Sequence, residues 1–490
     1  MANTDVQHDV IVIGAGIAGL VAANRAAQLG KRVVVLEKGE DQRYLCNSRY
    51  TYGTFHINYT DLGADEDVLA GRIEACSSGF ARKDLARAVA RDGRRLMQWL
   101  RSEGIDLVDL GVGYQTNVLA PPWRQGFGLN WRGYSGDVAL ERLEENLRRR
   151  QGRMLRGMRA RALALAPGAI VVEADAAAGA ARFTAPSVVI ADGGFQASHD
   201  LIRAHICPAP EKLLARNGGS ATGDGLRMAQ ALGAASTGLD MFYGHLHSRD
   251  AMQSTRLWPR PYVDEIAAAS IVIDADGRRF ADEGLGGIYL SNAVARLPDP
   301  LGATIVFDQA VWDGAPGRGH AQPPNPLLRD AGGTLHRAGT IAELAGLIGV
   351  APQRLEDLVA EYNAAIDAGT LHRLSPPRRG DRYRAWPIST APFFAVPICA
   401  AITNTMGGIV VDGHGAVLDR NDRPVPGLFA AGSTVGGLDG GPNAGYVGGL
   451  IKATIALRAA EAIAAAFDLL ADDGSRGLPR TTKQGDGGAS

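Results

Sequence analysis

The sequence predicts an α/β protein in which a discontinuous Rossmann-like domain is interrupted by an inserted α+β domain. Three observations support this fold class. Residues 8–38 read as a strand, a glycine-rich turn, a helix and a second strand. The chain then changes, from about Ala234, into mixed strand and helix signals. Strand-like segments return at 402–412 and 427–432, before a long closing helix at 450–469.

The unit at residues 8–38 has the pattern of a dinucleotide-binding turn. Apolar runs at 10–13 and 33–36 enclose an alanine-rich helical segment, and Glu37 ends the second run. The turn contains Gly14, Gly16 and Gly19. These glycines allow, in order, a tight bend, close approach to a pyrophosphate, and packing of the helix on the strand. The helix N-terminus attracts phosphate, and an acid at the spacing of Glu37 binds ribose hydroxyls. The alternative, an ordinary glycine turn, leaves the rest of the pattern unexplained.

Composition argues against several other classes of protein. The 51 Lys and Arg residues nearly balance the 52 Asp and Glu residues, so no net field draws the chain to nucleic acid or anionic membrane. The four cysteines lack the clustered spacing of iron–sulfur or haem sites, and we expect no metal. No run approaches the ~18 apolar residues of a membrane span. The N-terminus has no basic and apolar leader pattern, so a cytoplasmic protein is expected.

The first domain continues through helices into strands that end at glycines. The predicted helices cover 65–79, 84–103 and 136–150, and the predicted strands cover 169–173 and 182–190. The second strand enters Gly193 and Gly194, a pair that lets the backbone approach a cofactor. A glycine loop then precedes Asp224 at a helix start, where an acid also complements the helix dipole. The polar loop at 39–58 emerges where the first strands end, at the ligand edge of such a sheet.

The middle of the chain, from about residue 234, is expected to form the inserted domain. It includes the histidine-containing stretch GHLHSRD at 244–250, the strand-like ASIVIDADGRRFADEG, and a helical stretch at 342–366. The segment from Ala471 onward is rich in Gly, Asp and Ser, a composition typical of a disordered tail.

Seven segments follow one another in an order that matches one family. They are GAGIAGL with Glu37, NSRYT at 47–51, VVIADGGF at 188–195, TGDGLRMA at 222–229, GRRFADEG at 277–284, TMGGIVVD at 405–412 and PGLFAAG at 426–432. Together they resemble the FAD-dependent fumarate reductase and succinate dehydrogenase flavoprotein superfamily. The resemblance covers nearly the whole chain before the tail. It is strongest to the soluble desaturase branch, which includes tricarballylate dehydrogenase and the 3-ketosteroid dehydrogenases.

The resemblance implies FAD as the cofactor and fixes the domain boundaries. Residues 1–236 and 390–470 would form the FAD domain, 237–389 the cap that holds the substrate, and 471–490 a disordered tail. Tyr50 lies close to where membrane-bound relatives carry the histidine that bonds their flavin, so non-covalent FAD is expected. The implied FAD-binding residues are Gly14, Gly16, Gly19, Glu37, Lys38, Asn47, Ser48, Gly193, Gly194, Asp224, Gly432, Gly448, Gly449 and Leu450.

The groups that bind and protonate a dicarboxylate in fumarate reductases are missing. The offset from Glu283 at which those enzymes carry a proton-donating arginine falls on Gly287. Residues 403–405 replace the histidine expected before TMGG, and the segment LDGGPNAGYVGGL lacks the expected arginine. Because a bound carboxylate needs paired or hydrogen-bonded positive groups, these losses argue against dicarboxylate reduction.

Tyrosines and histidines are the remaining catalytic candidates. Tyr446 and Tyr289 lie near positions where ketosteroid dehydrogenases carry catalytic tyrosines, although Tyr289 is two residues too far from Glu283. Such tyrosines transfer a proton next to a carbonyl or polarise it, and the alternative for each is a half-buried phenol bonded to backbone. His245 and His247 are expected in the pocket wall, against the commoner alternative of structural histidines.

Three further residues have both a functional and a simpler interpretation. Arg49 and Arg260 are candidates for binding a carboxylate, although surface arginines are commoner. Cys46 is expected to be an inert thiol or a neighbour of the flavin.

The sequence therefore favours an FAD-dependent oxidoreductase acting on a small molecule. The expected reaction introduces a C=C bond next to a ketone or carboxyl group, with hydride transfer to flavin N5 and electrons passed to an external acceptor. Two alternatives stay open. One is the reverse reaction, an ene-reductase of an unsaturated acid fed by an external donor. The other is a flavoprotein that has lost its catalytic groups and acts as a binding or electron-carrier module.

Overall fold

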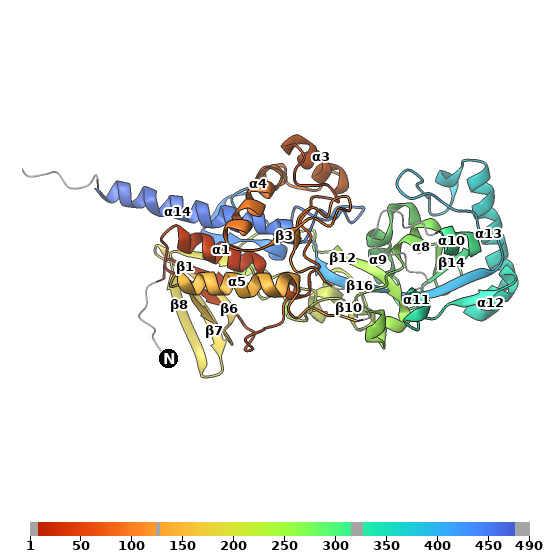
Figure 1. Cartoon of the computed structure of the whole chain (residues 1–490), viewed down its shortest axis with the longest axis horizontal. Helices are drawn as coiled ribbons and strands as arrows, with labels where there is room; N and C mark the ends of the chain where they lie inside the picture. Colours follow the sequence, from red (N-terminus) through yellow and green to blue (C-terminus); the bar gives the residue numbers. More distant parts are fainter. Residues whose placement is uncertain (1–7, 124–127, 315–326, 476–490) are drawn as a thin grey trace, which may run out of the picture.

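The computed structural model describes residues 8–123, 128–314 and 327–475 and contains two large sheets (Figure 1). The first sheet has six strands in the order β18-β19-β9-β1-β2-β5. These strands are β1 Val10–Ile13, β2 Val33–Leu36, β5 Arg153–Leu155, β9 Ser187–Ile190, β18 Ala416–Leu418 and β19 Pro424–Ala430. All neighbouring pairs are parallel except β18 with β19. The sheet therefore joins strands from both ends of the chain.

Helices cover this sheet because its central strands are apolar on both faces. Every residue of β1 and β2 is buried, as expected for parallel strands inside an α/β domain. Helix α1 (Ile17–Gln28) packs between α5 (Ser135–Arg149) and α14 (Ala453–Ser475). Asn24 joins α1 to α5 by donating to the carbonyl oxygen of Leu143 at 2.9 Å. Helix α4 (Lys83–Ser102) packs against α14, and α3 (Glu66–Cys76) packs against α4 (Figure 1).

The second sheet is built around β16 (Phe393–Thr405), the long strand that runs through the other half of the molecule (Figure 1). Its other strands are β10 Leu214–Ala215, β12 Phe242–Ser248, β13 Ile271–Ile273, β14 Thr304–Asp308 and β15 His336–Ala338. The helices of this half are α8 Asp264–Ala269, α9 Gly287–Ala295, α10 Gln309–Gly314, α11 Leu327–Asp330, α12 Ile341–Ile348 and α13 Pro352–Asp367. β12 pairs antiparallel with β16, which places His245 opposite Ala401.

Short elements complete the fold. A three-stranded antiparallel sheet contains β6 Arg159–Ala166, β7 Ala169–Ala176 and β8 Gly179–Ala185. Two small pairs are β3 Leu107–Val108 with β4 Val118–Leu119, and β11 Ser236–Thr237 with β17 Gly408–Ile409. The remaining α-helices are α2 Asn47–Tyr50, α6 His199–His205 and α7 Asp224–Ala231. Among the described helices, none combines the length and apolar character needed to cross a bilayer.

Three predicted elements differ from the structure. The strand expected at 182–190 is two strands in different sheets, β8 and β9, separated at Pro186, which cannot donate a ladder hydrogen bond. The helical stretch at 342–366 is broken into α12 and α13 because Gly349 is left-handed (φ 74°) and Pro352 starts a new helix. The strand expected at 402–412 lies instead in β16 and β17, outside the first sheet.

The end of the chain also differs in part. Helix α14 starts at Ala453 after a 3₁₀ turn at Leu450–Lys452, and it ends at Ser475, within the tail that the sequence predicts as disordered. Residues 476–490 lie outside the described residues. The mixed α/β architecture with a parallel sheet is confirmed, whereas the subdivision into an FAD domain and an inserted cap stays a prediction.

Candidate active site

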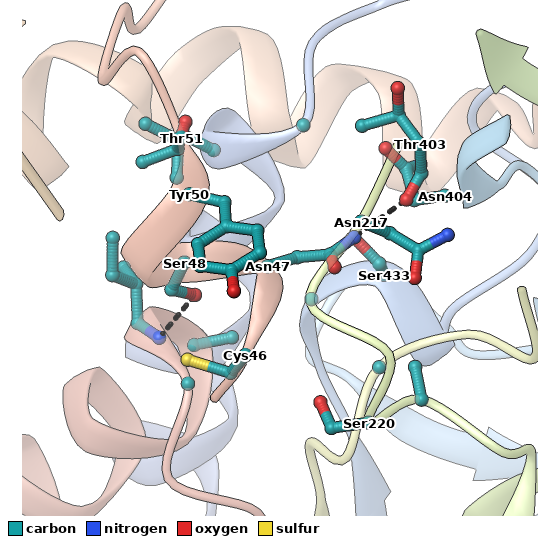
Figure 2. A pocket seen from close by; sticks show the side chains of 18 of the residues that line it. Cys46, Asn47, Ser48, Tyr50, Thr51, Asn217, Ser220, Thr403, Asn404 and Ser433 are labelled. Carbon is teal, nitrogen blue, oxygen red and sulfur yellow. Dashed lines mark hydrogen bonds between the residues drawn. The ribbon is translucent and has the colours of Figure 1, made fainter. Parts of the chain in front are cut away.

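A cavity of about 300 Å³ lies between the two sheets and opens at the carboxyl ends of β1 and β2. Its walls come from the turn after β1, the segment 46–54, the loop 216–221, and the ends of β12 and β16. Figure 2 shows Asn47, Ser48 and Tyr50 from the α2 segment facing Asn217, Thr403 and Asn404 across this space. The edge where parallel strands end is the usual ligand site of an α/β sheet.

The glycines at 14 and 19 are required by close packing. Gly14 has φ +94°, and a Cβ there would lie 2.7 Å from the carbonyl oxygen of Ala191 on β9's extension. A Cβ on Gly19 would lie 1.9 Å from the carbonyl oxygen of Gly14. Only glycines let α1 approach the turn this closely. The N-terminus of α1 therefore forms part of the cavity wall, where backbone N–H groups and the helix dipole favour a phosphate.

Side chains from the following loop hold this turn in place. Glu37 accepts hydrogen bonds from the backbone N–H groups of Ala15 (2.9 Å) and Gly39 (2.8 Å). Ser48 Oγ accepts from Ile17 N at 3.0 Å, the bond drawn in Figure 2. A carboxylate has about four lone-pair sites, so Glu37 keeps acceptors for ribose hydroxyls.

Asn47 bridges the two halves of the cavity. Its amide donates to the carbonyl oxygen of Thr403 at 2.7 Å, and its oxygen accepts from Gly218 N at 2.9 Å. At the other end of the cavity, Lys38 and Arg159 both contact Asp224, at 3.5 Å and 2.8 Å. The carboxylate of Asp224 is therefore neutralised by two cations, one of them from the β6 hairpin.

Asp192 is a buried carboxyl group in the cavity lining. Its Oδ2 accepts from Gly225 N at 2.7 Å, while Oδ1 is buried without a hydrogen-bond partner in the described residues. Burial raises the pKa of Asp192 to about 6. Its Oδ1 faces α7 rather than the cavity, since a Cβ built on Gly225 would lie 2.3 Å from this oxygen. The glycine turn, the N–H groups at the start of α1 and the remaining acceptor positions of Glu37 form a donor and acceptor set that fits FAD.

Most of the predicted FAD-binding residues meet at this cavity. Those in its lining are Gly14, Gly16, Glu37, Lys38, Asn47, Ser48, Gly193, Asp224, Gly432, Gly449 and Leu450. Gly19, Gly194 and Gly448 lie behind it and allow close packing; a Cβ on Gly194 would lie 2.0 Å from Thr405 Oγ1. Cys46 lines the cavity, and burial raises the pKa of its thiol to about 12, which makes it unreactive.

Two stacked tyrosines lie at the end of the cavity next to β12. The rings of Tyr243 and Tyr446 are 3.8 Å apart and nearly parallel, at 10°. The Tyr446 oxygen accepts from Gly449 N at 2.9 Å, so its own proton is available to another group. Burial raises the pKa of both phenols, with the proximity of the two rings contributing to the shift at Tyr446. Both phenols therefore carry their protons at neutral pH.

A hydrogen-bonded chain connects Tyr243 to a buried carboxylate. Tyr243 Oη lies 3.0 Å from His245 Nε2, and His245 Nδ1 lies 2.6 Å from Asp264 Oδ2. The other oxygen of Asp264 accepts from Leu246 N at 2.7 Å. The carboxylate holds the proton of His245 on Nδ1, which leaves Nε2 to accept from Tyr243. Burial lowers the pKa of His245, with Asp264 opposing the shift, so the imidazole is neutral.

Asp264 occupies the space next to Gly287. A Cβ at Gly287 would lie 2.0 Å from Asp264 Cγ. This is the position where the sequence comparison with fumarate reductases expects an arginine. The acid that holds His245 therefore excludes a side chain at 287.

The other predicted substrate-side residues lie elsewhere. Tyr289 is absent from the described lining of the main cavity. It lines a smaller adjoining pocket, and His245 and Tyr446 belong to the walls of both. His247 is buried behind the wall, with Nδ1 3.0 Å from the carbonyl oxygen of Leu257. Arg49 is fully buried in an ion pair with Asp137. The prediction that it binds a carboxylate of the substrate is therefore wrong, and its role is structural. Arg260 does line the cavity.

Sequence reasoning missed Tyr243, Asp264 and Arg216. Tyr243 comes one residue before the histidine stretch at 244–250 that the sequence singles out. Its spacing of two residues from His245 on a strand was the available signal. Asp264 and Arg216 had no local signal, because Asp264 contacts His245 from the start of α8 and Arg216 reaches the cavity from the loop after β10.

Comparisons with known proteins agree with this geometry. A family model described as an FAD binding domain matches residues 9–445. The probable fumarate reductase Ifc3 of Shewanella frigidimarina (strain NCIMB 400) is 26% identical over 452 residues, which cover 88% of this chain and 70% of that protein. The 4-oxocyclohexanecarboxylate 2-dehydrogenase of Sinomonas cyclohexanicum is 26% identical over 521 residues, 87% of each chain. The fold is similar to that of 3-ketosteroid delta1-dehydrogenase from Sterolibacterium denitrificans, with a TM-score of 0.68, 18% identity, and coverage of 94% of this chain and 100% of that one.

Proposed function

Because the chain belongs to the FAD-binding family whose model spans residues 9–445, we propose that it introduces a C=C bond next to a carbonyl or carboxyl group of a small molecule. It is an FAD-dependent oxidoreductase of the fumarate reductase and ketosteroid dehydrogenase type. One observation carries this proposal: the chain Tyr243–His245–Asp264 ends at the cavity beside Tyr446. Desaturation next to a carbonyl requires a base for the α proton, and this chain supplies one.

Bound FAD supplies the hydride acceptor at its isoalloxazine ring. The proton is handled by the protein. Tyr243 gives its phenolic proton to the neutral Nε2 of His245, and the resulting imidazolium is stabilised by Asp264 at 2.6 Å. The Tyr243 oxygen then takes the α proton of the substrate. Arg216 and Arg260 oppose the effect of burial on the pKa of Tyr243, and so stabilise its ionised form.

Tyr446 is proposed to polarise the substrate carbonyl. Because its oxygen accepts from Gly449 N, its O–H group can donate to the substrate oxygen that gains negative charge. Tyr289 and His247 have no contact with the main cavity that would support the catalytic roles predicted for them. We propose Tyr243 in the place of Tyr289.

The reverse reaction uses the same groups. Because burial keeps Tyr243 protonated, this phenol is also a competent acid for the α carbon of an unsaturated substrate. An ene-reductase fed by an external donor is therefore the second candidate function.

Anaerobic mixing of the FAD-loaded protein with cyclic ketones and cyclic carboxylic acids tests the direction. We expect at least one compound to bleach the visible flavin absorbance, because hydride transfer reduces the flavin. If none does, and unsaturated acids instead reoxidise the dithionite-reduced protein, the enzyme is the ene-reductase. If neither occurs, the protein is a binding or electron-carrier module.

The pH dependence of desaturation should have its acid limb below pH 6.5. Burial lowers the pKa of His245 from the ordinary value of 6.5, so the imidazole becomes protonated only at lower pH. A protonated His245 can no longer accept the proton of Tyr243. The turnover number, measured from pH 5 to pH 8, a range around that ordinary histidine pKa, should be flat above 6.5 and fall below it. In His245→Gln this limb should disappear along with most activity. An acid limb above 6.5 would contradict the role of His245.

A further inference from the structure

We propose that Arg216 and Arg260 form a subsite for an anionic group of the substrate and that the aromatic wall beside them holds a ring, so that the substrate is a cyclic or aryl-substituted carboxylic acid. This names the substrate class of the reaction proposed above and rests on that proposal. Neither arginine corresponds to the dicarboxylate-binding groups that the sequence lacks.

Arg216 reaches the cavity from the loop after β10, and its hydrogen bonds leave its charge uncompensated. Nη1 donates to Thr403 Oγ1 at 2.8 Å, and Nε donates to the carbonyl oxygen of Pro259 at 3.3 Å. Both acceptors are neutral. In the described part of the chain no carboxylate pairs with this guanidinium, and Nη2 keeps its donors. A planar fork with free donors suits a carboxylate.

Arg260 faces the same cavity with its charge held between aromatic rings. Its Cζ lies 5.5 Å from the ring centre of Tyr52 and 5.6 Å from that of Tyr262. Such cation–π contacts position a guanidinium without using its N–H donors. Within the described ranges Arg260 also has no carboxylate partner, and the nearby Asp264 is already bonded to His245 and Leu246.

Two unpaired cations in one cavity repel each other and are costly to bury. Burial lowers the pKa of Arg216, and the charge of Arg260 lowers it further. An anion between them would offset both effects, whereas a neutral ligand would leave the repulsion in place. The pair therefore selects for a ligand with negative charge.

The wall next to the arginines is aromatic. Tyr50 packs edge-on against Trp258, with ring centres 6.2 Å apart, and Tyr52 packs edge-on against Trp123 at 6.3 Å. All four residues line the cavity. Flat aromatic faces make more contact with a ring than they make with an open-chain acid such as a small dicarboxylate.

The phosphates of FAD are the competing anion. They would lie at the N-terminus of α1, where the glycine turn and the helix dipole meet. The groups that touch Arg216 and Arg260 are Thr403, Pro259, Tyr52 and Tyr262. None of these belongs to the α1 turn, and Tyr262 stacks on His245, a member of the proton-transfer chain. This places the two arginines at the substrate end.

Ligand binding to the FAD-loaded protein tests the subsite without requiring turnover. Benzoate, cyclohexanecarboxylate and 3-phenylpropanoate would each be titrated beside its methyl ester, with the flavin absorbance as the signal. We expect at least one acid to bind about tenfold or more tightly than its ester, because hydrogen bonds to charged groups are the strong ones. Arg216→Gln and Arg260→Gln should each remove about that factor for the acid and leave the ester unchanged.

Arg278→Gln, which removes an exposed arginine of the turn after β13, is the charge-matched control and should change neither affinity. FAD content and melting temperature would be measured for every variant. Equal affinity for all acids and their esters overturns the proposal, as does equal weakening of acid and ester. Loss of FAD from a soluble variant assigns that arginine to the cofactor and also overturns it. Acid-selective binding in a protein whose flavin is never reduced supports the subsite and contradicts the desaturation.

Discussion

Replacing Tyr243 with phenylalanine should lower the turnover number by about 10²–10⁴-fold, the usual contribution of a positioned acid or base. The substitution removes the oxygen that lies 3.0 Å from His245 Nε2 and keeps the ring that stacks on Tyr446. FAD content and binding of a carboxylic acid should therefore stay unchanged. Single-turnover flavin reduction, followed by stopped-flow absorbance, measures the effect on the chemical step.

Tyr289→Phe is the matched control for this experiment. Tyr289 lies in the adjoining pocket rather than in the lining of the main cavity, so its hydroxyl should not affect turnover. A large loss in Tyr289→Phe together with a small loss in Tyr243→Phe would restore the role that the sequence predicted for Tyr289. It would also remove the proton-transfer chain from the mechanism.

Gly19→Ala should abolish FAD binding and lower the melting temperature. The added methyl group would lie 1.9 Å from the carbonyl oxygen of Gly14, a backbone atom that cannot move without displacing the turn. Overpacking of this kind costs about 1–3 kcal/mol or more, and here the displaced element is the one that would hold the pyrophosphate. The FAD absorbance per protein and the thermal unfolding midpoint measure the two effects.

Gly71→Ala provides the control for the added methyl group. Gly71 is exposed in α3, and nothing lies within 4 Å of a Cβ built there. Since alanine is favoured over glycine in a helix by about 0.8–1 kcal/mol, this variant should be equally or slightly more stable. If Gly19→Ala also kept its FAD and its melting temperature, the close packing of α1 on the turn would not matter for the cofactor.

The parts of the fold that the sequence predicted correctly depend on local patterns. The turn after β1 is recognisable because three glycines, two apolar runs and Glu37 lie within one short segment. Helices such as α4 and α5 follow from apolar periodicity alone. The single strand expected at 182–190 was wrong because both of its halves are β-strands that follow each other directly, and only Pro186 marks the point where the chain changes sheets.

The substrate side of the site was harder to predict because it is assembled from distant segments. Arg216, Tyr243 and Asp264 are positioned by the pairing of β10 and β12 with β16 and by the start of α8, whereas Tyr446 reaches Tyr243 from the turn before Leu450. No spacing in the sequence reports those contacts. Tyr446 and His245 were identified from the family resemblance. Their partners, Tyr243 and Asp264, lie outside the sequence motifs on which that resemblance rests.

The packing of Gly287 against Asp264 restricts how this enzyme can evolve. A single mutation from glycine to arginine at 287 would bring no fumarate-type proton donor, because its first methylene group would collide with Asp264. Moving Asp264 would remove the hydrogen bond to His245 Nδ1. The His245 ring could then rotate, and its proton would no longer be held on Nδ1. A variant with only the change at 264 would then lack both the arginine and the ordered His245 of the proposed proton-transfer chain. If the proposed chemistry holds, a change to a fumarate-type proton donor therefore requires substitutions at 264 and 287 together.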